Sequence, residues 1–286
     1  MTRNPSNQRP PFRRPTILIG TDSTMLGRPM IGPSQASAAG LHGIDLDLRR
    51  AWRSPGPGSL ADDTSIRVRS VWLPALYTGP FAAQRAERLA SFLEHATAHL
   101  GLRTLILPKP DSSRAHGVPL GPVAGDIATR MGARIALRLG AETLLERSGS
   151  HLEHVANMRR IAEEWDMDIA LDLTSPDIER WEAEAALVRL FPRLTLVRIR
   201  PAHDGDGLPG TTSEARASLR TIGMLADQGY SGTITIAPEP VAPSWMSFLY
   251  VPNLEIANIT RESIMGAYDR IDLYDETTRE SRQHHP

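Results

Sequence analysis

The sequence contains no cysteine and only one lysine, Lys109, among its 286 residues. The lack of cysteine excludes disulfides, thiolate metal sites and a cysteine nucleophile. Schiff-base chemistry has Lys109 as its single candidate, and the proline on each side of this lysine favours a rigid exposed loop instead. The formal net charge of −1 provides no basic field that would hold a nucleic acid. We therefore expect no nucleic-acid partner.

Long apolar runs are missing as well. No stretch approaches the roughly 18 apolar residues that a membrane span requires, and the N-terminal residues lack the apolar core of a signal peptide. The patterns of a serine nucleophile elbow, a phosphate-binding P-loop, a dinucleotide fingerprint and a helical zinc protease motif are also absent. These absences predict a soluble cytoplasmic protein with no membrane partner.

What the sequence does contain is a repeated alternation of a short apolar strand, a turn and a helical stretch. The eight candidate strands are ILIGT from Ile17, GIDLDL from Gly43, IRVRSVWL from Ile66, RTLILP from Arg103, ARIALRL from Ala133, DIALDL from Asp168, TLVRIR from Thr195 and TITIA from Thr233. Such alternation predicts βα units with a parallel sheet. Eight units predict an α/β fold of the (β/α)8 TIM barrel type, whose active site lies at the C-terminal ends of the strands.

The helices and the ends of the domain can be placed in the same way. Apolar residues recur at helical spacing in four segments, 82–100, 155–165, 178–188 and 215–226. The Gly- and Pro-rich stretch between Trp52 and Ser65 predicts a shortened or missing second helix, and a long eighth loop precedes the last helix. We expect a disordered arm at 1–15, one barrel domain at 16–274 and a flexible tail at 275–286.

The order of these units carries a family resemblance. Together with the segments GLHGIDLDL, DIALDLTSPD and DQGYSGTITIAPEP, it resembles the xylose isomerase-like sugar phosphate isomerase/epimerase superfamily, relatives of endonuclease IV. The resemblance covers about residues 16–245 and implies proton transfer on a sugar or hydroxy-carbonyl compound. In this family a divalent metal is typically held by a Glu on strand five, an Asp on strand six, a His or Gln on strand seven and a Glu on strand eight. The two Glu residues usually also transfer protons.

The sequence departs from this family pattern at three of the four metal positions. Alternate side chains of a barrel strand point inward and toward the helices. This parity places Arg138 of strand five and Arg198 of strand seven inward, where the family has Glu and His or Gln. Asp172 of strand six occupies the expected Asp position. On strand eight the Glu position falls on Ala237, and Glu239 lies two residues further, in a Pro-Glu-Pro turn.

Arginine stays protonated and cannot ligate a metal ion. We therefore expect no metal ion and no cofactor; a strand register different from the one assumed would bring Glu142 or Glu239 into play and restore a divalent metal site. The three adjacent strands allow Asp172 to sit between the guanidinium groups of Arg138 and Arg198. Two interpretations stay open: a structural ion network that fills a disused site, and a pocket for a substrate carboxylate or phosphate.

Four further residues are candidates for contact with a substrate. Asp47 shares its inward parity with Asp45, and it either accepts hydrogen bonds from substrate hydroxyls or balances the arginines. Arg200 keeps the inward parity of strand seven. Trp72, at the end of strand three, either stacks on a sugar face or packs in the core. His203 follows strand seven in a Gly- and Asp-rich loop, for which an exposed turn is the alternative.

These observations predict a sugar isomerase/epimerase-like barrel in which Asp172 and Glu239 act as acid and base. Its partner is a small sugar or an anionic hydroxy acid, and a homo-oligomer is compatible with the sequence. The alternative is a non-catalytic ligand-binding or interaction protein on a barrel that has lost its metal site. An endonuclease IV-like hydrolase would need a cluster of His, Asp and Glu donors and a basic face, and the sequence shows neither.

Overall fold

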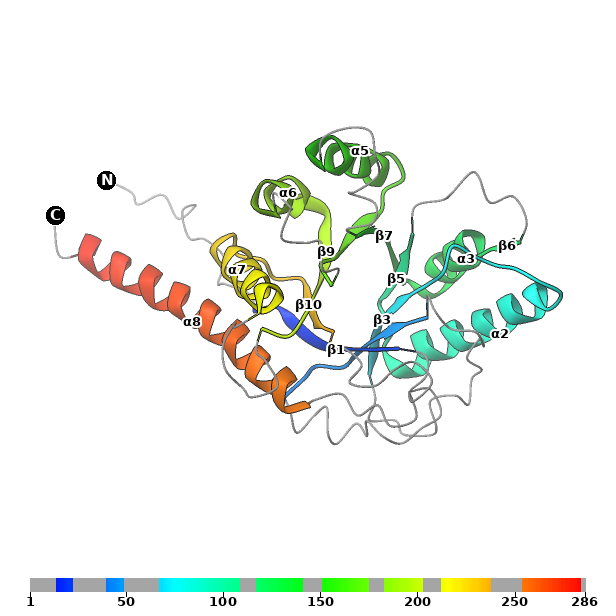
Figure 1. The fold of residues 1–286 in the computed structure, drawn as a ribbon, viewed down its shortest axis with the longest axis horizontal. Helices are drawn as coiled ribbons and strands as arrows, with labels where there is room; N and C mark the ends of the chain where they lie inside the picture. Colours follow the sequence, from blue (N-terminus) through cyan, green and yellow to red (C-terminus); the bar gives the residue numbers. More distant parts are fainter. Residues whose placement is uncertain are drawn as a thin grey trace, which may run out of the picture.

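Eight short apolar segments form parallel strands that close into a barrel with helices around it (Figure 1). The computed structural model describes residues 14–22, 40–48, 67–108, 117–140, 151–174, 183–202, 212–237 and 254–283. The barrel strands are β1 (Thr16–Asp22), β2 (Ile44–Asp47), β3 (Val68–Trp72), β5 (Thr104–Leu107), β7 (Arg134–Gly140), β8 (Asp168–Asp172), β9 (Leu194–Ile199) and β10 (Thr233–Ile236). Around the barrel they follow the order β1-β10-β9-β8-β7-β5-β3-β2. The predicted TIM barrel and its eight strands are confirmed.

The outer layer consists of helices that bury one apolar face against the strands. They are α2 (Ala82–His95) with a π-helical continuation (Ala96–Leu100), α3 (Gly121–Met131), α5 (His151–Glu164), α6 (Ala183–Leu190) with a 3-10 turn (Phe191–Arg193), α7 (Ser213–Asp227) and α8 (Leu254–Gln283). Helix α3 has no stripe in the sequence analysis, because it contains two glycines and buries only Ala124 and Ile127. No helix in the described part of the chain is long and apolar enough to cross a membrane.

Some expected features lie outside the described residues. These are the shortened second helix, the long eighth loop before α8 and most of the N-terminal arm. At the other end, α8 runs along the outside of the barrel next to α7 (Figure 1) and continues to Gln283. The backbone is therefore helical through most of the segment that the sequence analysis treats as a tail.

A small antiparallel ribbon lies outside the barrel sheet. Strand β4 (Leu76–Tyr77) follows β3, and it pairs with β6 (Val118–Pro119), which precedes α3. The Leu120 backbone N–H also donates to the Ala75 carbonyl at 3.1 Å. The ribbon thus joins the connection after β3 to the connection after β5, on the side of the barrel where the strands end.

The apolar core has two outer parts and one inner part. One outer cluster packs α5 to α8 against β1 and β7 to β10, and the other packs α2 and α3 against β2, β3 and β5. The inner cluster consists of Trp72, Ile106, Ala136, Ala170 and Leu196, whose side chains fill the barrel interior. Strands that are buried on both faces explain why the sequence shows nearly continuous apolar runs.

A buried hydrogen bond fastens α8 to the barrel. The Tyr268 hydroxyl donates to the Tyr230 carbonyl at 2.6 Å, and both residues are at most 2% exposed. The variant Tyr268→Phe should lower the free energy of unfolding by about 1–2 kcal/mol, because the buried carbonyl loses this donor. Urea unfolding measures the change. Val188→Ala, at a residue that is 54% exposed on α6, serves as the control and should change stability by less than about 0.5 kcal/mol. Equal effects of the two variants would contradict the prediction.

Candidate functional site

Polar side chains gather inside the barrel, toward the C-terminal ends of the strands. The buried members of this group are Asp45, Ser70, Asp172, Arg198 and Thr235, each at most 7% exposed. Barrel enzymes hold their substrates at this end, because the loops that follow the strands surround it. The group is therefore the candidate functional site.

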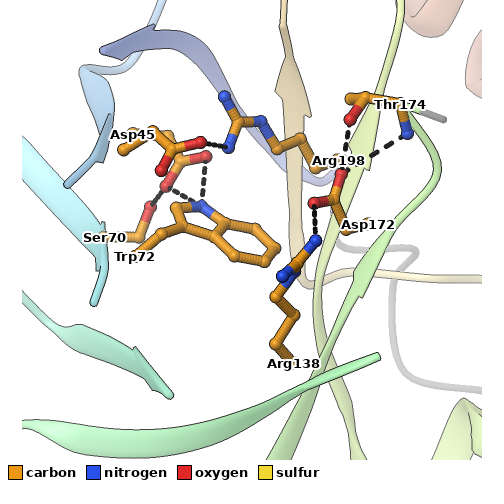
Figure 2. A network of polar contacts seen from close by, with 8 residues as sticks. Asp45, Ser70, Trp72, Arg138, Asp172, Thr174 and Arg198 are labelled. Atoms are coloured by element: carbon orange, nitrogen blue, oxygen red, sulfur yellow. Dashed lines mark hydrogen bonds and ion pairs between the residues drawn. The ribbon is translucent and has the colours of Figure 1, made fainter. Parts of the chain in front are cut away.

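Arg138 and Asp172 form the first ion pair of the site (Figure 2). They belong to the neighbouring strands β7 and β8, and both point inward, as the strand parity predicts. The Arg138 Nη2 lies 3.3 Å from Asp172 Oδ2. Thr174 covers the other carboxylate oxygen, since its hydroxyl donates to Oδ1 at 2.7 Å and its backbone N–H at 3.4 Å. Asp172 is only 4% exposed. Its carboxylate therefore interacts mainly with Arg138 and Thr174 and little with solvent.

Arg198 and Asp47 form the second ion pair. Arg198 Nη1 donates to Asp47 Oδ2 at 2.8 Å, and the two side chains are 9% and 12% exposed. The Arg198 side chain starts on β9 and reaches β2, past β10 and β1. Gly20 of β1 leaves room for the guanidinium group. A Cβ at this position would lie 3.3 Å from Arg198 Nη2, which is tighter than most real Cβ contacts. The expected sharing of Asp172 by both guanidinium groups is therefore wrong for Arg198, whose hydrogen-bonded carboxylate is Asp47.

Asp45 is a site residue that the sequence analysis did not propose for chemistry, although its parity with Asp47 signalled its inward direction. It is fully buried, and the Trp72 indole Nε1–H donates to its two carboxylate oxygens at 2.8 and 2.7 Å. The Ser70 hydroxyl donates to the same carboxylate (Figure 2). Burial raises the pKa of Asp45, although the charge of Arg198 and the two donors oppose the rise.

The pH dependence of stability should report this raised pKa of Asp45. A raised folded-state pKa means that the folded protein binds the proton more tightly than the unfolded chain does. The resulting stabilisation is fully present below the unfolded value of 3.8 and is lost as the pH rises through the folded value. The variant Asp45→Asn should therefore gain stability relative to the wild type as the pH rises from about 4 to 7. Urea unfolding of both proteins across this range tests it, and a constant difference would contradict it.

Trp72 and Arg200 occupy different environments from the two ion pairs. Trp72 is fully buried, and its ring centroid lies 5.3 Å from the Arg198 guanidinium carbon, which favours packing over stacking on a sugar. Arg200 follows the end of β9. Its Nε donates to the Thr174 carbonyl at 2.6 Å, and its Nη1 donates to Glu214, in the first turn of α7, at 3.0 Å. Arg200 therefore lies between the end of β8 and the start of α7.

Two further candidates of the sequence analysis, Glu239 and His203, lie outside the described residues. Their roles stay predictions, and the same holds for Glu142 and Lys109.

The described residues at the positions where the resemblance implies metal ligands do not fit a divalent cation. These residues are Arg138, Asp172, Arg198 and Ala237. Asp172 is the one possible ligand among them, and Arg138 and Thr174 already contact its two oxygens. Among the residues that the structure describes, no three His, Cys, Asp or Glu side chains lie close enough together to hold a metal ion. A dication needs several such donors.

The sequence matches no known family model and no curated protein. The fold, in contrast, matches solved structures. A sugar phosphate isomerase/epimerase from Parabacteroides distasonis is similar with a TM-score of 0.52 at 12% identity, over 86% of this chain and 94% of that one. The 3-keto-D-glucoside 4-epimerase of E. coli has a TM-score of 0.51 at 15% identity, over 87% of this chain and 100% of that one. The D-psicose 3-epimerase of Clostridium cellulolyticum has a TM-score of 0.52 at 12% identity, over 88% and 97%.

At these identities the comparison shows the fold alone. The chain has the fold of the sugar phosphate isomerase/epimerase barrels, as the resemblance in the sequence implies.

Proposed function

We propose that this barrel binds a small sugar or an anionic hydroxy acid at the C-terminal ends of its strands and isomerises or epimerises it by proton transfer without a metal ion. The observation that carries the proposal is the presence of two largely buried ion pairs, Arg138–Asp172 and Arg198–Asp47, at the end of the barrel where barrel enzymes bind their substrates. The similarity of the fold to two sugar epimerases supports the substrate class.

The chemistry follows from the charges of these groups. The Asp172 carboxylate removes a proton from the carbon next to the substrate carbonyl, and negative charge then develops on the carbonyl oxygen. A guanidinium group at this oxygen stabilises the charge in place of a Lewis acid, because it is permanently protonated and fixed by the fold. Arg138 and Arg198 are the groups in reach of the site. The abstracted proton stays on Asp172, and a different proton is delivered to the other face of the carbon to complete an epimerisation; we assign this delivery to a protonated Glu239.

The remaining candidates bind the substrate in this proposal. Asp47 accepts a hydrogen bond from a substrate hydroxyl in addition to the one from Arg198. Arg200 and His203 follow β9 and contact the part of the substrate that lies nearest the loops. Trp72 does not contact the substrate in this proposal. It donates a hydrogen bond to Asp45 and packs against the guanidinium group of Arg198.

A second candidate function is a non-catalytic ligand-binding or interaction protein. The pairing of both Asp172 and Asp47 with arginine favours it, because paired carboxylates also stabilise a barrel interior that performs no chemistry. Such a protein would bind a sugar acid and leave it unchanged.

Hydrogen exchange into the substrate distinguishes the two functions. The purified protein is incubated with ketoses, 3-keto sugars and sugar acids in deuterated water that contains EDTA, and proton NMR follows the carbon next to the carbonyl. We expect deuterium to enter at this carbon despite the chelator. Binding without deuterium incorporation would support the second function. Incorporation that stops on chelation and returns with a divalent metal would overturn the metal-free proposal.

A further inference from the structure

Arg198 uses only part of its hydrogen-bonding capacity. Among the described residues it donates through Nη1 alone, to Asp47, and its buried Nε makes no hydrogen bond. The guanidinium group carries five N–H donors in one plane, so it can donate to Asp47 and still hold donors for a second carboxylate. Arg198 is only 7% exposed, so bulk solvent reaches little of this side chain.

The hydroxyl of Thr235, which lies opposite Arg198, is a second buried polar group without a hydrogen-bond partner among the described residues. The side chain of Thr235 is fully buried, and its hydroxyl makes no hydrogen bond to the part of the chain that the structure describes. The register of β9 and β10 sets Thr235 directly opposite Arg198, so that both side chains enter the barrel at one level. On its other side Thr235 is paired with Leu18 of β1, which offers no polar group.

The carboxylates of the interior do not account for these two donors. Asp172 is held by Arg138 and Thr174, and Asp45 by Ser70 and Trp72. Asp47 accepts from the other nitrogen of Arg198. Nearly all buried polar groups in proteins have a partner, so two unpaired donors side by side in a site indicate a ligand atom that is still to be bound.

We infer that Arg198 Nε and the Thr235 hydroxyl form a carboxylate subsite, and that the ligand of this barrel is therefore a sugar acid rather than a neutral sugar. Arginine supplies donors only, and its strongest hydrogen bonds go to a charged oxygen. Asp47 keeps the guanidinium group in place from the other side, which prepares the free edge before the ligand arrives. The inference rests on the proposed function, because it names the substrate class of the same site.

Isothermal titration with matched ligands tests the subsite. The probes are D-gluconate, D-galactonate and L-threonate, each compared with the alditol that has a hydroxymethyl group in place of the carboxylate. We expect at least one aldonate to bind at least tenfold more tightly than its alditol. Thr235→Val keeps the shape of the side chain and removes the hydroxyl, and it should weaken that aldonate about tenfold without affecting the alditol.

Thr233→Val is the matched control, since Thr233 lies on the same strand, two residues closer to its start, and is not part of the proposed subsite. Urea unfolding adds a readout that is independent of ligand. Removal of a buried hydroxyl that has no partner should leave Thr235→Val as stable as the wild type or more stable. A clear loss of stability would instead assign the hydroxyl to the fold.

Several outcomes would overturn the subsite. They are equal affinity for aldonate and alditol, unchanged aldonate affinity in Thr235→Val, and no binding of any aldonate. The proposed function would survive all three if deuterium still entered a neutral ketose. In contrast, tight aldonate binding without any deuterium incorporation would keep the subsite and remove the catalytic proposal.

Discussion

The variant Asp172→Asn should lower kcat by about 10²–10⁴-fold, the usual contribution of a positioned general base. Asparagine keeps the size of the side chain and can still accept the hydrogen bond from Thr174, but it cannot take a proton from a carbon atom. The KM should change little, because the guanidinium groups that hold the substrate remain. The initial rate of deuterium incorporation measures the effect.

Asp168→Asn provides a control on the same strand. Asp168 begins β8 at the opposite end of the barrel, and it pairs at 3.4 Å with Arg134, whose side chain is 73% exposed. Its replacement should leave the rate unchanged. Full activity of Asp172→Asn would remove Asp172 from the mechanism, and an equal loss in both variants would point to a general disturbance of β8.

The variant Arg198→Met should lower the free energy of unfolding by about 3–5 kcal/mol, the range for removal of one partner from a buried ion pair. Methionine fills similar apolar space but leaves the Asp47 carboxylate without its cation, at a side chain that is only 12% exposed. The charge of Arg198 also opposes the rise in the pKa of the fully buried Asp45. Urea unfolding is suitable, since urea does not screen charges.

Two further variants separate charge from packing. Arg134→Met removes an exposed ion pair and should cost at most about 1 kcal/mol. The double variant Arg198→Met with Asp47→Asn should recover part of the stability, because the uncompensated charge is gone. An equal loss of unfolding free energy in Arg198→Met and Arg134→Met would show that the Arg198–Asp47 pair contributes no more to stability than the exposed pair does.

The strands and their inward residues could be predicted from the sequence because both depend on local patterns. In LRL of β7 and VRI of β9 the apolar neighbours face the helices, which turns Arg138 and Arg198 inward without further information. Helix α3 cannot be predicted from a local pattern, because its two glycines interrupt the helical spacing of its apolar residues.

The partners of the inward residues could not be predicted in this way. Asp172 is the register neighbour of Arg198, and strand order alone suggests that the two form a pair. The structure instead connects Arg198 to Asp47 on β2, over Gly20. This pairing depends on the absence of a side chain at Gly20, which lies on another strand. The alternation of residues in β9 contains no information about that position. The role of Asp45 cannot be predicted from β2 alone, because its carboxylate is held by Ser70 and Trp72 of the neighbouring strand β3.

The ribbon of β4 and β6 has a consequence for motion at the open end of the barrel. It ties the connection after β3 to the connection after β5 by backbone hydrogen bonds, with the Leu120–Ala75 bond at its side. Residues 76–77 and residues 118–119 therefore cannot move apart without breaking the hydrogen bonds of the ribbon. At this end of the barrel, the start of the chain after β3 and the start of α3 are therefore expected to move together as one unit and not as two separate loops.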